Sequence, residues 1–219
     1  MSSFLKIISC CFFSNLIFLP LFYLGVRPIV KSNEPSQAKN KPTNIKYNRL
    51  FWYADNESGT YVPYTDSLYI SKMSNQEKAA VAFSSIFYDN YCDSSDGSMT
   101  KRCSMIELMG LGKQCSQHNI EFLKYWFSQD KKSIGELQGC QIVPLTATYQ
   151  ERFVDVSSAR IGDLYLVKFT AGGMDLREMK TWKWKQLDRY LLRKGRMVKL
   201  DSKISSREER NLEEPNDKD

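Results

Sequence analysis

Residues 164–200 read LYLVKFTAGGMDLREMKTWKWKQLDRYLLRKGRMVKL, and this stretch decides the fold class. Apolar and polar side chains alternate through residues 164–170 and 178–192, which is typical of β-strands that bury one face. Gly172-Gly173 and Lys194-Gly195 are turn-forming pairs, and a last strand follows from Arg196 to Leu200. Long strands joined by short turns predict an antiparallel meander.

The residues before this meander carry helix signals. Ser74-Asn75-Gln76-Glu77 is a capping box followed by an apolar stripe of helical period, so we expect a helix that ends near Cys92. Further predicted elements are a hairpin over residues 50–63, helices over 104–111 and 116–127, and a strand over 142–156. Helices that precede an antiparallel sheet are typical of the α+β class.

The N-terminal segment, residues 7–26, reads IISCCFFSNLIFLPLFYLGV and contains no charged side chain. A helix of this length can cross a bilayer core of about 30 Å. No pair of small residues marks a cleavage site before Arg27, so we expect an uncleaved transmembrane signal anchor behind a cytoplasmic tail of residues 1–6. A cleaved signal peptide is one alternative, and a lipidated Cys10 is another.

The remaining chain divides by composition. Residues 27–46 are rich in Ser, Asn, Pro and Lys and lack an apolar period, which predicts a linker. Residues 47–201 are expected to form one exported α+β domain. Residues 202–219 are nearly all polar and predict a disordered charged tail.

Four cysteines follow the anchor: Cys92, Cys103, Cys115 and Cys140. An even number in an oxidising compartment predicts two disulfides, for which three connectivities exist. The pairs Cys92–Cys103 and Cys115–Cys140 close the shortest loops, so we prefer them. A zinc site or a nucleophilic pair built from Cys115 and His118 is an alternative that would require a free thiolate. We therefore expect no metal, no cofactor and no catalytic residue.

The basic character of the chain is concentrated late in the sequence. The formal net charge is +6, and residues 177–203 contain ten Lys and Arg against three acidic residues. Lysines interleaved with tryptophans can bind a protein partner, a membrane or a nucleic acid. For an exported domain, a nucleic acid is the least favoured of these partners. Alternatively, the tryptophans face the core and the lysines form a solvated face, or the acidic residues after Ser202 fold back onto this strand. The predicted partner-binding residues are Trp182, Lys183, Trp184, Lys185 and Arg189.

The order of these elements is similar to the nuclear transport factor two-like fold. The residues that carry the resemblance are the capped helix after Ser74, the strands over 145–156 and 164–170, and the Trp182/Trp184 strand with its Lys194-Gly195 hairpin. The resemblance implies a cone in which a curved antiparallel sheet wraps around helices. Among exported proteins of this fold, the chain looks like the bitopic assembly proteins of bacterial type IV secretion and conjugation machines. That likeness implies a non-enzymatic scaffold that self-associates and contacts other subunits.

Together these features predict a single-pass inner-membrane protein with its domain in the periplasm or on the extracellular side. We expect it to be a scaffold or protein-binding subunit, plausibly of a secretion or conjugation assembly, with protein partners in the cell envelope. The alternative is a secreted small-ligand-binding or enzymatic α+β domain released by signal cleavage. A third hypothesis is an inhibitor or immunity-type protein of the envelope that binds one partner.

Overall fold

The structure is a computed structural model that describes residues 44–55, 61–92, 101–141 and 149–212. Within these ranges no helix is both long enough and apolar enough to cross a membrane. The predicted anchor over residues 7–26 lies outside the described residues, so it stays a prediction.

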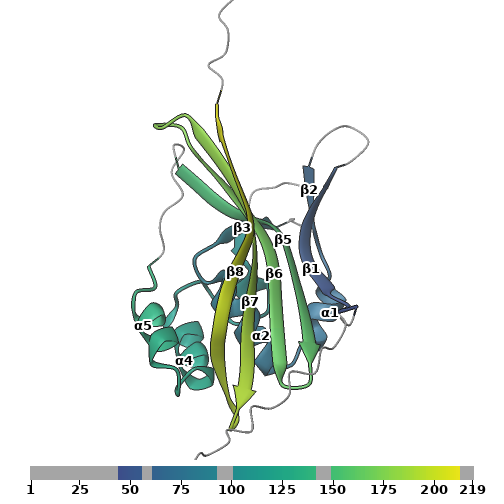
Figure 1. Cartoon of the computed structure of the whole chain (residues 1–219), viewed down its shortest axis with the longest axis vertical. Coiled ribbons are helices and arrows are strands. Elements are labelled where there is room, and N and C mark those ends of the chain that lie inside the picture. Colours follow the sequence, from purple (N-terminus) through teal and green to yellow (C-terminus); the bar gives the residue numbers. More distant parts are fainter. Residues whose placement is uncertain (1–43, 56–60, 93–100, 142–148, 213–219) are drawn as a thin grey trace, which may run out of the picture. The chain divides into compact units, whose positions relative to one another are not determined.

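A six-stranded antiparallel sheet forms the frame of the domain (Figure 1). Its strands follow the order β2-β1-β5-β6-β7-β8. The register of β5 shifts between Phe153 and Asp155, and that of β8 shifts opposite Lys185 and Gln186 of β7. Such shifts mark β-bulges, which bend a strand and increase its twist. The strands are β1 (Asn48–Asp55), β2 (Tyr61–Thr65), β5 (Tyr149–Ile161), β6 (Leu164–Asp175), β7 (Lys180–Arg193) and β8 (Arg196–Asn211).

The helices lie on one face of this sheet, which we call the inner face (Figure 1). They are α1 (Ser67–Lys72), α2 (Asn75–Ser85), α3 (Met105–Leu108), α4 (Gln117–Trp126) and α5 (Lys131–Gln138). A small hairpin of β3 (Asp89–Cys92) and β4 (Lys101–Ser104) follows α2. Helices packed on a curved antiparallel sheet confirm the predicted α+β class.

Helix α2 is the centre of the core. The Ser74 hydroxyl accepts a hydrogen bond from the Glu77 backbone N–H at 3.2 Å, which confirms the predicted cap. Phe83 packs on Phe127, with ring centroids 4.6 Å apart, and on Tyr190 of β7. The helix ends at Ser85 rather than near Cys92, because residues 89–92 pair with β4 instead. The sequence analysis predicted neither this hairpin nor α5.

The predicted turn at Gly172-Gly173 is wrong, because both glycines lie inside β6. Gly172 pairs with Lys183 and Gly173 with Trp182, and the chain turns only after Asp175. A Cβ atom on Gly172 would lie 3.3 Å from the Trp182 carbonyl oxygen, so this glycine permits a close approach of two strands. The Lys194-Gly195 turn is confirmed, with φ of 51° and 72°, the positive values of a type I′ hairpin turn.

The predicted disordered tail is wrong for residues 202–211, which continue β8 along the whole length of β7. The basic start of β7 meets the acidic end of β8, and the Lys180 ammonium lies 3.5 Å from the Glu209 carboxylate. Opposite charges on neighbouring strands favour the pairing. The alternative that acidic residues fold back onto the basic strand is therefore confirmed, while residues 213–219 lie outside the described ranges.

A disulfide joins Cys115, just before α4, to Cys140, just after α5, with the two Cα atoms 5.9 Å apart. This pairing was predicted. Because Cys115 is bonded, its sulfur is not available as a zinc ligand or as a nucleophile beside the exposed His118. Cys92 and Cys103 lie on β3 and β4, where the backbone register pairs them with Lys101 and Asn90. Their side chains are outside the described part of the structure, so the second bridge stays a prediction.

Candidate functional site

A pocket of about 540 Å³ lies on the inner face at the end of the sheet where β6 turns into β7. Strands β5, β6, β7 and β8 and the residue Tyr88 form its walls. Its volume falls in the range of small-molecule sites, which is about 300–1,000 Å³.

Strand register explains why this part of the sheet is hollow. One row across the four strands contains Glu151, Gly173, Trp182 and Glu209, in that order. The next inner row contains Phe153, Ala171, Trp184 and Arg207. Strand β6 contributes only Gly and Ala to these two rows, so its side chains fill little of the space between the large side chains of β5 and β7.

The floor of the pocket is aromatic. Tyr88 lies with its ring centroid 6.1 Å from that of Trp184 and 4.7 Å from that of Phe153. Trp184 is half-buried and packs against the hydrophobic core, which fixes its position. Trp182, Gln186 and Ile204 complete this part of the lining. A rigid aromatic floor can contact an apolar or planar ligand at low entropic cost.

The rim of the pocket is charged. The Lys180 ammonium lies 3.6 Å from the Glu178 carboxylate and 3.5 Å from the Glu209 carboxylate. Asp175 accepts a hydrogen bond from the Arg177 backbone N–H at 2.9 Å and a longer one from its guanidinium. Burial acts to raise the pKa of Asp175, but these hydrogen bonds outweigh it and hold that pKa below its ordinary value. Among the residues whose side chains the structure describes, Glu151 and Arg207 have no ion-pair partner.

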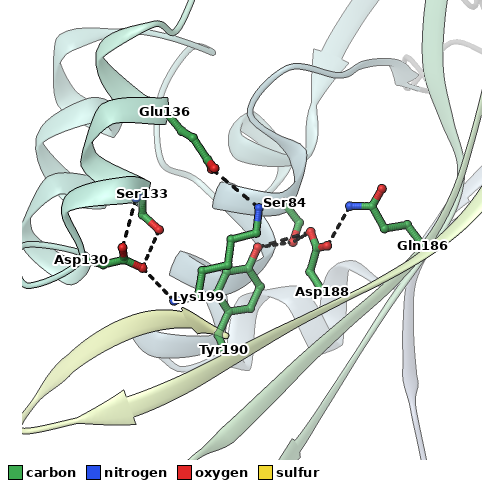
Figure 2. A network of polar contacts seen from close by, with 8 residues as sticks. All are labelled: Ser84, Asp130, Ser133, Glu136, Gln186, Asp188, Tyr190 and Lys199. Carbon is green, nitrogen blue, oxygen red and sulfur yellow. Dashed lines mark hydrogen bonds and ion pairs between the residues drawn. The ribbon is translucent and has the colours of Figure 1, made fainter. Parts of the chain in front are cut away.

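A buried polar network adjoins the pocket at Gln186 (Figure 2). The Gln186 side-chain amide donates to Asp188 Oδ1 at 2.7 Å, and the Ser84 hydroxyl donates to Asp188 Oδ2 at 2.8 Å. Tyr190 lies 2.6 Å from the Ser84 hydroxyl and donates to Asp188 at 3.4 Å. Asp188 is only 1% exposed. Burial, and then the negative charge of Asp188, raise the pKa of Tyr190 well above its ordinary value.

A second network anchors α5 to β8 (Figure 2). The Lys199 backbone N–H donates to Asp130 Oδ2 at 3.0 Å, and the Lys199 ammonium lies 3.6 Å from the Glu136 carboxylate. Burial acts to raise the pKa of Asp130, but hydrogen bonds from Ser133 and from the Lys199 backbone lower it overall. These contacts connect the disulfide-closed helix pair α4–α5 to the edge of the sheet.

The structure divides the five predicted partner-binding residues between the two faces of the sheet. Trp182 and Trp184 line the pocket on the inner face. Lys183 and Lys185 are exposed on the opposite, outer face, and Arg189 forms an ion pair with Asp201 there. These residues therefore do not form one continuous surface.

Of the residues that line the pocket, only Trp182 and Trp184 were predicted as site residues from the sequence. The residues that were not predicted are Tyr88, Glu151, Asp175, Glu178, Lys180, Gln186, Ile204, Arg207 and Glu209. The alternation of residue types shows which side chains share one face of one strand. It does not show which rows of different strands lie side by side, and that arrangement creates the pocket. The small residues Ala171 and Gly173 of β6 are the one signal in the sequence that could have indicated this pocket, and Gly173 belongs to the pair that predicted a turn.

In comparisons with known proteins, no family model, no curated protein and no solved structure matches this chain. The functional argument therefore depends on the site itself.

Proposed function

We propose that this chain is an exported binding protein, held at the membrane by residues 7–26, whose pocket takes a small organic ligand. The observation that carries the proposal is the pocket of about 540 Å³ with an aromatic floor and a charged rim. Pockets of this size, with aromatic lining and a few convergent polar groups, are the usual sites of small ligands. The proposal takes small-ligand binding from the alternative hypothesis of a secreted, cleaved domain and keeps the uncleaved anchor of the first hypothesis.

We propose binding rather than catalysis, because the side chains best suited to chemistry are engaged. Lys180 is held between two carboxylates, and Asp175 accepts hydrogen bonds from Arg177. Asp188 is buried and occupied by three neutral donors. A catalytic acid or base must reach the substrate within hydrogen-bond distance.

Filling the hollow of the pocket should abolish ligand binding. A library of small organic fragments, screened by ligand-observed NMR, should contain fragments that bind the wild-type chain. These fragments should lose at least about tenfold in affinity with Gly173→Val, because the new side chain occupies the gap between Glu151 and Trp182. Gly173→Ala fills less of the gap and should cost less.

The matched control is Lys183→Ala on the exposed outer face, which should leave fragment binding unchanged. Circular dichroism and thermal unfolding report whether each variant is folded. If folded Gly173→Val binds every fragment as well as the wild-type chain does, the pocket is not the binding site and the proposal fails.

A second candidate function is the scaffold or protein-binding subunit of a cell-envelope assembly, which the resemblance to type IV secretion proteins implies. Two observations favour it. Lys183 and Lys185 are exposed on the outer face without an ion-pair partner among the described residues. Strand β8 is an edge strand of the sheet, and its backbone N–H at Lys199 donates to Asp130. Exposed edges and unpaired charges are surfaces on which proteins dock.

The double variant Lys183→Glu with Lys185→Glu tests the scaffold function. The domain should stay folded, and defined cross-linked complexes formed by the wild-type chain in its own membrane should be lost. Lys72→Glu with Lys132→Glu applies the same charge change at exposed positions on helices and should leave these complexes intact. Complexes that persist in the first variant would show that the outer-face lysines are only a solvated surface.

A further inference from the structure

The charges around the pocket do not balance. Four carboxylates line it, from Glu151, Asp175, Glu178 and Glu209, against two cations, Lys180 and Arg207. Lys180 is shared between Glu178 and Glu209, and Asp175 is bound by Arg177. Among the residues whose side chains the structure describes, which exclude Lys101 and Arg102, none forms an ion pair with the half-buried Glu151.

Arg207 does not neutralise Glu151, because the two residues lie on opposite walls. Glu151 is on β5 and Arg207 on β8, with β6 and β7 between them. Neighbouring strands are about 4.8 Å apart, so the two backbones are separated by roughly 14 Å. Arg207 is exposed and its guanidinium is accessible to water, whereas Glu151 lies beside the gap that Gly173 leaves.

The floor adds to the negative character of the pocket. The amide nitrogen of Gln186 donates to Asp188, so the amide oxygen of Gln186 is not bound to Asp188 (Figure 2). Asp188 itself is buried, and its three hydrogen-bond donors, Ser84, Gln186 and Tyr190, are all neutral. A ligand in the pocket therefore meets acceptors on the side of Gln186 and a carboxylate on the side of Glu151.

The aromatic side chains favour the same kind of ligand. The negative face of an aromatic ring attracts a cation within about 6 Å of its centroid, and Trp is the strongest of the three rings. Trp182, Trp184 and Tyr88 all line this pocket. An ammonium group placed between these rings and Glu151 would be attracted both by the faces of the rings and by the negative charge of the carboxylate.

We infer that the pocket selects an organic cation, a small molecule in which an ammonium group is attached to an aromatic or aliphatic body. The body packs on Tyr88 and Trp184, and the ammonium group pairs with Glu151. This inference rests on the proposed function and names the ligand class for the same pocket.

Three probes with one shared body test the inference: 4-phenylbutylamine, 4-phenylbutan-1-ol and 4-phenylbutyrate, titrated into the purified full chain by calorimetry at neutral pH. The amine should bind about tenfold more tightly than the alcohol, and the carboxylate should bind most weakly. Glu151→Gln keeps the shape of the side chain and removes its charge. It should reduce the affinity for the amine to that for the alcohol and leave the alcohol unchanged.

The matched control is Glu208→Gln, which neutralises an exposed carboxylate on the outer face of β8 and should change none of the three affinities. Equal affinities for the three probes, or tightest binding of the carboxylate, would overturn the cation inference while leaving the pocket as a ligand site. Failure of the amine to bind would also overturn it. The fragment screen with Gly173→Val then decides separately whether the proposed function survives.

Discussion

Replacing Asp188 with Ala is expected to lower the free energy of unfolding by about 3 kcal/mol or more. The substitution removes the common acceptor of Ser84, Gln186 and Tyr190. Each buried donor that loses its partner costs about 1–3 kcal/mol, and the missing carboxylate also leaves a small cavity. Because Ser84 belongs to α2, the change also weakens the contact between α2 and β7.

Urea denaturation measures this effect. The dependence of the free energy of unfolding on urea concentration should be the same in the variant and the wild-type chain, because unfolding exposes the same surface in both. Asp201→Ala is the matched control, because it removes a carboxylate from an exposed ion pair with Arg189 and should cost less than about 1 kcal/mol. Tyr190→Phe should cost about 1 kcal/mol, since it removes one hydroxyl from the same network. A loss below 1 kcal/mol for Asp188→Ala would mean that the network does not hold α2 to the sheet.

Removing the disulfide with Cys115→Ala and Cys140→Ala is expected to cost about 3 kcal/mol. The two residues are 25 positions apart, and the bridge limits the freedom of that segment in the unfolded chain. The closed segment carries α4 and α5, and α5 holds β8 through Asp130 and Lys199. The loss should therefore loosen the edge of the sheet as well as the helix pair.

Equilibrium unfolding with and without a reducing agent checks the disulfide prediction. The reductant should destabilise the wild-type chain more than the double variant, and the difference between the two losses should be about 3 kcal/mol. Alkylation before and after reduction reports whether Cys115 and Cys140 are bonded in the cell. Free thiols at both positions in freshly isolated protein would contradict the bridge and weaken the case for export to an oxidising compartment.

Several elements could be predicted because their signals are local. Ser74 and Ser116 each precede a helix and accept a backbone N–H of its first turn, at 3.2 Å and 3.4 Å. Lys194-Gly195 adopts the positive φ values that a tight hairpin turn needs. Each of these features depends on residues a few positions apart, which interact in the same way in any fold.

The misread elements depend on distant partners. Gly172-Gly173 has the composition of a turn, yet pairing with β5 and β7 keeps both residues in the strand. Residues 202–211 have the composition of a disordered tail, yet β7 supplies opposite charges and a free edge that order them. In both places tertiary pairing overrides local propensity, because the strand gains its hydrogen bonds from a neighbour that composition does not reveal.

The sequence by itself determined the α+β class and that Trp182 and Trp184 share one face of their strand, and it favoured the pairing of Cys115 with Cys140 among three connectivities. The tertiary structure alone decided that Glu151, Gly173 and Trp182 share one row, and that Asp188, one of three acids in a basic stretch, is buried beside the pocket. Alternation along a strand is a property of one segment, whereas strand register and β-bulges are set by the packing of all the segments together.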